Sequence, residues 1–362
     1  MYKIADYVIN DQKVNNEWSA EGGDRIETIY LTFFGGREEF VNSNGGIRRL
    51  LGQREMNNVV KLDNNYLATT MQYRSDDVLK EYADSIVAFD RYLKSKGIPL
   101  IYASTPYTVS KYDTQLPEGK ADYGNNNIDR LLGFLTEGEV EVLDFRETMK
   151  QDGIDQYELM YKTDHHWTTE AGFYAFQKLA DRFEKLLDFE ISDELKNLDN
   201  YDRRTYQNSF LGSRGQRVGK LYTGNDDFEL FVPKFDTLVE KDGIKGTMPE
   251  LAYDQKWLSE NQYNGQFLYD YVLGGSLANY KNLLATNDKK LLIITDSMGK
   301  AVNPYLILSF KEVMTVSNHD TMNLKREVIE QFDPDVVLLL YYPGQLEDNS
   351  DAFKFGINFE ES

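Results

Sequence analysis

The stretch KKLLIITDSMG, residues 289–299, decides the fold class of this chain. Its centre is a short apolar run without alternation, which is typical of a strand buried on both faces of a parallel sheet. A small polar turn follows, and then the helical pattern KAVNPYLILSF over 300–310. A buried strand that passes directly into a helix is the repeating unit of an α/β fold.

The same rhythm recurs on both sides of this stretch. Apolar residues at helical spacing or in short buried runs predict the following elements: helix 76–97, strand 98–106, helix 127–137, strand 140–145, helix 168–187 with Thr168 as N-cap, strand 313–318, helix 322–332 and strand 334–344. Strands that alternate with helices predict an α/β fold in three layers, with a parallel sheet between two layers of helices.

Two regions depart from this rhythm. Residues 1–75 are polar and weakly periodic, so we expect an irregular N-terminal segment that packs on the core, with short strands such as 58–67. The α/β domain spans 76–362, interrupted at about 188–285 by a largely β insertion. Within it we predict short strands at KLYTG and FELFVPKF and glycine-rich connections at LGSRGQRVG (211–219) and LGGS (273–276).

The composition excludes several classes of function. The formal charge of −20 over 362 residues repels phosphate backbones, which makes nucleic acid an improbable partner. The chain has no cysteine, so it has no disulfide, thiolate metal site or cysteine nucleophile. No run reaches the roughly 18 apolar residues of a membrane span, and the first residues lack the pattern of a signal peptide. We expect the chain as written to be soluble, without a cofactor or a metal.

The stretch YKTDHHWTTEAG, residues 161–172, contains two of the three histidines. In an extended segment, Asp164 and His166 project to the same side and His165 to the opposite one. A carboxylate beside an imidazole fixes its tautomer and stabilises the imidazolium, which is half of a catalytic triad. The alternative is structural: Asp164 caps a turn and His166 is a packed, hydrogen-bonded ring.

Ser297 supplies a candidate nucleophile for the other half. It follows the buried strand LLIIT (291–295), at the carboxyl edge of the sheet, where open α/β folds hold their ligands. The N–H groups of Ser297 and Gly299 at a helix start would favour an oxyanion. The alternative is an Asp-Ser helix cap. Taken together, the two stretches favour acyl transfer through Asp164, His166 and Ser297.

The segments TDHHWT and TDSMG, in this order, resemble the DHHW family, which is related to the alginate O-acetyltransferase-like proteins of the SGNH hydrolase superfamily. The resemblance implies a circularly permuted SGNH-type sheet and assigns the triad to Asp164, His166 and Ser297. It also implies an extracytoplasmic acetyl ester hydrolase or O-acetyltransferase that acts on a cell-surface or exported polysaccharide. A membrane-bound O-acyltransferase is the implied source of acetyl groups.

Three departures from the family pattern concern the oxyanion site. Thr295 stands where the family has Gly before Asp-Ser, and Ser276 stands where we expect Asn. The strand 334–344 ends without the usual G-x-N-D, so we expect either that Tyr341, Tyr342 or Gln345 takes the place of the missing Asn or that the oxyanion hole is weaker. Arg214 and Arg217 are candidates to border the cleft and bind an acidic sugar, although solvated loop charges explain them equally well.

Other functions stay open at this point. A metal site would use Asp164, His165, His166 and His319, but neighbouring histidines in a strand point opposite ways. A carbohydrate-binding or assembly protein would keep the fold without an effective oxyanion site. Trp167 and Trp257 would stack on sugars or simply pack in the core. A phosphate-binding site is disfavoured because GGREE, GSRGQRVG and LGGS match no phosphate-loop motif.

Overall fold

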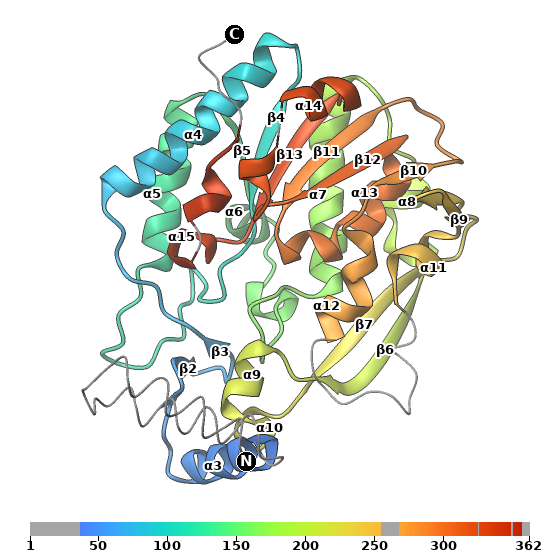
Figure 1. Ribbon diagram of the computed structural model, residues 1–362. Coiled ribbons are helices and arrows are strands. Elements are labelled where there is room, and N and C mark those ends of the chain that lie inside the picture. The colour runs from blue at the N-terminus through green and yellow to red at the C-terminus, as the bar shows by residue number, and fades with distance from the viewer. Residues whose placement is uncertain (1–36, 255–267, 325, 349, 357–362) are drawn as a thin grey trace, which may run out of the picture.

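A mostly parallel sheet forms the centre of the protein, as predicted (Figure 1). The computed structural model describes residues 37–254, 268–324, 326–348 and 350–356. Within them, the five parallel strands are β5 (Glu141–Asp144), β4 (Leu100–Ser104), β13 (Val336–Tyr341), β11 (Lys290–Thr295) and β12 (Glu312–Ser317), in this spatial order. The antiparallel strands β10 (Tyr280–Asn282), β8 (Val239–Lys241) and β9 (Ile244–Gly246) extend the sheet beyond β12.

The strand order identifies the place where a ligand would bind. If the parallel strands are numbered from β11, with β4 and β5 counted after β13, their order across the sheet is 2-1-3-4-5, which is the flavodoxin-like doubly wound order. Along this chain the fourth and fifth strands come before the first three, as the predicted permutation requires. In such sheets the ligand crevice lies at the carboxyl edge between strands 1 and 3. Here these strands are β11 and β13.

Two groups of helices cover the sheet. On one side, α7 (Thr169–Leu187) packs against α13 (Asn303–Ser309), where the ring of Tyr305 lies 5.0 Å from that of Phe173. On the other side are α4 (Asp76–Ser95), α5 (Gly124–Glu137) and α14 (Arg326–Phe332), with α4 and α5 side by side in Figure 1. The central strands β4, β11 and β13 are mostly apolar because both of their faces are buried, whereas the outer strands β5 and β12 are partly exposed.

Short helices complete the described core. They are α6 (Phe145–Gln151), α15 (Gln345–Asp348) and the 3-10 turns η1 (Gln156–Leu159), η2 (Leu198–Asn200), η4 (Gly274–Ser276), η5 (Ser297–Ala301), η6 (Thr321–Asn323) and η7 (Ser350–Phe353). The predicted cap of α7 is confirmed, because the Thr168 hydroxyl accepts a hydrogen bond from the N–H of Ala171 at 3.1 Å. Among the described residues, every helix is too short or too polar to span a bilayer.

The insertion contains an antiparallel ribbon of β6 (Tyr201–Phe210) and β7 (Asp226–Pro233), together with β8, β9 and β10. It also contains the short helices α8 (Asp193–Lys196), α9 (Ser213–Val218), α10 (Lys220–Thr223), α11 (Met248–Ala252) and α12 (Leu268–Leu273). The strand predicted at KLYTG is therefore wrong, since that stretch forms α10. LGSRGQRVG is not a plain connection either, since it contains α9.

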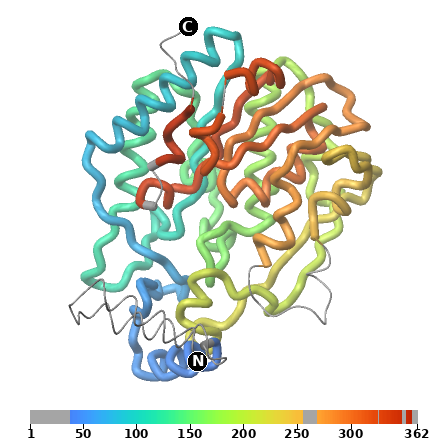
Figure 2. The backbone as a smooth tube through the Cα atoms, viewed as in Figure 1, coloured from blue at the N-terminus to red at the C-terminus, as the bar shows by residue number. Residues whose placement is uncertain are grey.

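The N-terminal region is more regular than expected. Residues Arg37–Leu50 form helix α3, and β1 (Glu55–Met56), β2 (Val59–Lys61) and β3 (Leu67–Ala68) form a small sheet. Figure 2 shows α3 beside α9 and α10 of the insertion, far away in sequence. A Cβ on Gly45 would collide with the carbonyl oxygen of Val218 in α9. Glycine lowers the helical signal of the sequence, but it allows α3 to pack closely against α9. The boundary at residue 75 stays a prediction.

Candidate active site

The side chains of Ser297, His166 and Asp164 form one hydrogen-bonded chain at the edge between β11 and β13. Ser297 Oγ lies 2.6 Å from His166 Nε2, and His166 Nδ1 lies 3.0 Å from Asp164 Oδ2. Asp164 and His166 are each 3% exposed, whereas Ser297 is partly accessible. The structure thus brings together the three residues that the sequence analysis singled out.

A turn places Ser297 at this edge. Asp296 follows β11, and its carboxylate accepts hydrogen bonds from the N–H of Met298 at 2.9 Å and of Tyr342 at 2.7 Å. The second bond ties the end of β11 to the residue after β13. Burial raises the pKa of Asp296, while these N–H donors act in the opposite direction. Ser297 opens the 3-10 turn η5, and α13 starts only at Asn303, so the expected direct entry into an α-helix is wrong.

The loop that carries Asp164 and His166 is a closed turn. Its two ends pair through an isolated bridge between Met160 and Trp167. The indole N–H of Trp167 donates to the carbonyl of Met298 at 3.0 Å and thereby fixes the loop to the Ser297 turn. Trp167 is fully buried, so it packs and does not stack on sugars; Trp257 lies outside the described residues.

The turn overturns one geometric expectation. Because the segment is bent and not extended, His165 does not face away: its ring centroid lies 3.9 Å from that of His166. The possible metal-ligand atoms of Asp164, His165 and His166 lie within 4.8 Å of one another. The expectation that His165 and His166 point in opposite directions and therefore cannot share a metal ion is also wrong. These atoms form hydrogen bonds with one another and with the hydroxyls of two serines, so a hydrogen-bond network accounts for their proximity.

Asp164 is held by many donors. Its Oδ1 accepts hydrogen bonds from the N–H of His165 at 2.8 Å, from Ser213 Oγ at 2.7 Å and from the Ser213 N–H at 3.3 Å. Burial would raise the pKa of this carboxyl group, but the imidazoles of His166 and His165 lower it well below its ordinary value. An ionised Asp164 accepts hydrogen bonds and cannot donate them.

Two residues that sequence reasoning missed, Asp226 and Tyr269, position this loop. Asp226 accepts hydrogen bonds from the N–H groups of Lys162 and Thr163 at 3.0 and 2.9 Å. The ring of Tyr269 stacks on His166, with 4.0 Å between centroids and 19° between planes. Asp226 and Tyr269 each lie more than 50 residues from the loop residue that they contact. No local pattern could have found them.

The structure does not support most of the expected oxyanion and substrate residues. The Gly299 N–H donates to the carbonyl of Asp296 at 3.2 Å. Tyr341 donates to the carbonyl of Ala352, and Ser276 Oγ lies 2.7 Å from the carbonyl oxygen of Leu273 and 3.1 Å from that of Lys300. Both side chains are at most 1% exposed, so the expectation that they contact substrate is wrong.

Arg214 is also placed differently from the expectation. Its guanidinium is buried and donates to the carbonyls of Leu67 and Asp164 at 3.0 and 2.9 Å and to Thr108 Oγ1 at 2.7 Å. A cation in this position binds the triad loop to the core and has no surface for an acidic sugar, so that expectation is wrong. Arg217 is exposed.

Of the remaining candidates, Tyr342 lies at the site. It is partly accessible, and its ring centroid lies 5.3 Å from that of His165. The amide of Gln345, by contrast, donates to Asp296 at 3.3 Å. The role of Tyr342 in binding substrate or an oxyanion stays a prediction.

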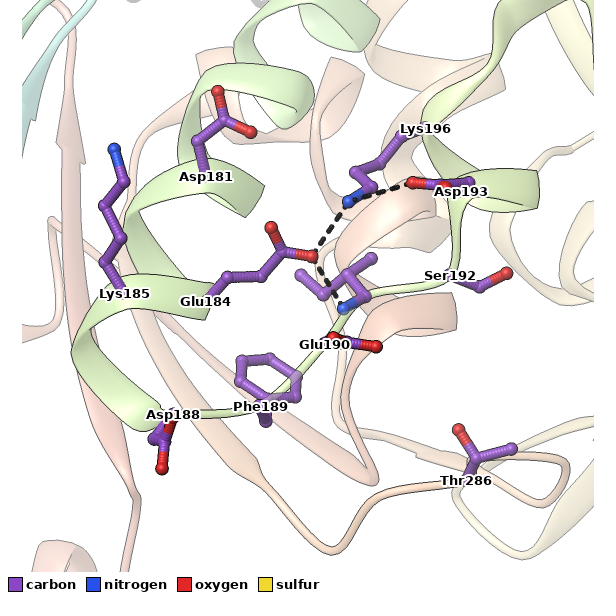
Figure 3. A pocket seen from close by; sticks show the side chains of 11 residues that line it. Asp181, Glu184, Lys185, Asp188, Phe189, Glu190, Ser192, Asp193, Lys196 and Thr286 are labelled. Atoms are coloured by element: carbon purple, nitrogen blue, oxygen red, sulfur yellow. Dashed lines mark hydrogen bonds and ion pairs between the residues drawn. The ribbon is translucent and has the colours of Figure 1, made fainter.

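A hollow of about 1010 Å³ lies elsewhere, at the end of α7 (Figure 3). Its lining includes Glu184 and Lys196, whose side chains pair at 2.8 Å, and Asp193, which lies 3.3 Å from Lys196. None of the triad residues lines it.

Comparisons with known proteins agree with this geometry. A family model described as "ALGX: SGNH hydrolase-like domain, acetyltransferase AlgX" matches residues 66–202, which include Asp164 and His166. This part of the chain is similar to an SGNH hydrolase-like domain. The predicted resemblance and the predicted fold class are thereby confirmed. No curated protein matches the chain in sequence.

Solved structures with a similar fold cover most of the chain. PatB1 of Bacillus cereus is 20% identical with a TM-score of 0.63, and the alignment covers 82% of this chain and 99% of PatB1. A second PatB1 structure, with a sulfonyl adduct, has 18% identity and a TM-score of 0.60 over 82% and 97%. A DHHW family protein of Eubacterium siraeum is 19% identical with a TM-score of 0.58, over 82% and 95% of the two chains. These likenesses show the fold.

Proposed function

We propose that the protein is a serine-dependent O-acetyltransferase or acetyl esterase that acts on a polysaccharide. The observation that carries the proposal is the chain Ser297–His166–Asp164, with contacts of 2.6 and 3.0 Å, at the topological switch point of the sheet. The family model's description as an acetyltransferase supports acetyl as the group transferred.

The proposed reaction has two halves. His166 Nε2 takes the Ser297 proton while Oγ attacks the acetyl carbonyl, and the imidazolium then gives that proton to the leaving alkoxide. The acetyl group is now an ester of Ser297. A hydroxyl of the acceptor attacks this ester, His166 takes the hydroxyl proton, and the proton returns to Ser297 as the serine leaves. Asp164 holds the Nδ1 proton and balances the charge of the imidazolium.

A glycan hydroxyl as acceptor makes the protein a transferase, and water makes it an esterase. We propose an extracytoplasmic location and an acetyl supply from a membrane-bound O-acyltransferase, on the strength of the family resemblance. A carbohydrate-binding or assembly protein is the second candidate. It is favoured by the internal hydrogen bonds of Gly299, Tyr341 and Ser276, which leave these predicted oxyanion donors already engaged.

Acyl-enzyme formation tests the proposal. We expect p-nitrophenyl acetate to give a burst of p-nitrophenol and an acetyl adduct by intact mass, both lost in Ser297→Ala. A sulfonyl fluoride should label Ser297, in parallel with the sulfonyl adduct of PatB1. Ser192→Ala is the matched control, since Ser192 only caps α8. If the wild-type chain forms no adduct with either reagent while folded, the proposal fails and the binding protein is favoured.

A further inference from the structure

His165 lies beside the proposed nucleophile, and the triad mechanism assigns it no part. Its ring is 3.9 Å from that of His166 between centroids, tilted by 36°. Unlike His166, whose side chain is 4% exposed, the His165 side chain is 31% exposed. An imidazole that reaches the surface next to a triad can contact a substrate.

The proton positions around His165 follow from its neighbours. Ser213 Oγ lies 2.7 Å from Asp164 Oδ1 and 3.2 Å from His165 Nδ1, and His165 Nδ1 itself lies 3.0 Å from Asp164 Oδ1. The ionised carboxylate only accepts, so the single hydroxyl proton of Ser213 points to Asp164. His165 Nδ1 therefore faces two acceptors, the carboxylate and the hydroxyl oxygen, which places the His165 proton on Nδ1. Burial and the neighbouring His166 lower the pKa of His165, which favours the neutral ring.

One carboxylate therefore supports two parallel chains. The first runs from Ser297 through His166 to Asp164, and the second runs from His165 to Asp164, both directly and through Ser213. In both, Nδ1 carries the proton and Nε2 presents a lone pair. The Nε2 of His166 forms a hydrogen bond with Ser297 Oγ, whereas none of the described residues forms a hydrogen bond with the Nε2 of His165.

We propose that His165 Nε2 accepts a hydrogen bond from a second hydroxyl of the acceptor, next to the hydroxyl that attacks the acetyl-enzyme. Two imidazole lone pairs side by side fit two hydroxyls on neighbouring carbons, as sugars and glycerol carry them. The Tyr342 ring, 5.3 Å from His165, gives an apolar wall for the carbon skeleton. The site thus selects a vicinal diol over water or a simple alcohol. This inference rests on the proposed function and specifies its acceptor.

Partitioning of the acetyl-enzyme between acceptors tests the inference. After a burst with p-nitrophenyl acetate, transfer is compared for 1,2-propanediol and 1,3-propanediol, which contain the same atoms but differ in the spacing of their hydroxyls. One neutral hydrogen bond is worth up to about a tenfold preference for the 1,2-isomer. His165→Ala should abolish this preference, which is measured as the ratio of the two transfer products within each variant, so that a change in its burst rate does not enter the comparison.

Further variants separate recognition from folding. Ser213→Ala leaves the contact of 3.0 Å between His165 Nδ1 and Asp164 Oδ1, which holds the same tautomer, so we expect most of the preference to remain, and Ser192→Ala should keep all of it. His165→Gln offers an amide oxygen in place of the lone pair and should retain part of the preference, even where His165→Ala folds poorly. Absence of any wild-type burst would refute the proposed function itself. A wild-type burst without a 1,2-preference, or an equal preference in His165→Gln, His165→Ala and wild type, would overturn this inference alone.

Discussion

Replacing Asp164 by Asn changes one atom and tests the proton arrangement of the site. The asparagine oxygen is expected to take the place of Oδ1, because that position receives donors from His165 and Ser213. Its NH₂ group then faces His166 Nδ1 in place of Oδ2. Since an NH₂ group donates, Nδ1 must accept, and the imidazole proton moves to Nε2. That proton points at Ser297 Oγ, so His166 can no longer take the serine proton.

The expected loss follows from this wrong tautomer. Serine proteases with the same change lose about 10⁴-fold in turnover, so we expect a loss of about 10³ to 10⁴ in the rate of acyl-enzyme formation. At 1.36 kcal/mol per decade, this is about 4 to 5.5 kcal/mol of transition-state stabilisation. Stability should change less, by about 1 to 3 kcal/mol, because Asn keeps the hydrogen bonds from His165 and Ser213 and loses only the contribution of the charge.

Stopped-flow measurement of the p-nitrophenol burst gives the rate, and urea unfolding followed by the fluorescence of buried Trp167 gives the stability. Asp193→Asn is the matched control, because Asp193 is fully solvent-exposed in its ion pair with Lys196. A folded Asp164→Asn variant whose burst rate stays within tenfold of wild type would refute the tautomer argument.

Four further results are expected. Arg214→Met should lower the free energy of unfolding by about 2 to 4 kcal/mol in urea, because it leaves buried carbonyls unpaired; a loss below 1 kcal/mol would contradict the assigned role. Gly212→Ala should slow the burst about 10- to 100-fold, because the new Cβ would lie 2.7 Å from Asp164 Cγ and displace it, whereas Gly133→Ala, with open space around it, should not. The pKa of Asp164 is lower in the folded protein than its value of about 3.9 in the unfolded chain, which stabilises the fold at higher pH. This stabilisation is lost as the pH falls from the unfolded-state pKa toward the folded-state pKa. Urea midpoints between pH 5 and 3 should therefore drop more in wild type than in Asp164→Asn. Incubation with EDTA should leave the burst unchanged, and a loss restored by Zn²⁺ would revive the metal site.

Local sequence patterns predicted the regular part of the fold. The apolar runs of β4, β11 and β13 are strands because both faces of the sheet are covered, so composition alone marks them. Thr168 marks the start of α7 because its hydroxyl bonds a group three residues away. Such signals lie within one turn or one strand, which is why they can be recognised without the fold.

Patterns failed where distant contacts override local preference. Helix α3 contains Gly45, which favours a loop in isolation and close packing against α9 in the folded chain. KLYTG alternates like a strand, yet it forms α10 beside α3. Arg214 looks like a solvated loop charge, but the fold surrounds it with carbonyls and a hydroxyl.

The sequence by itself determined the α/β class and the three residues of the candidate triad, because strand ends and residue types are local properties. Only the tertiary structure decided how they meet: Ser297 lies 131 residues from His166, and the switch point between β11 and β13 brings them within 2.6 Å. It also turned His165 toward the site, through a bend held by Ser213 and Asp226 from the insertion. Hydrogen bonds across such separations depend on the whole chain, so no short stretch encodes them.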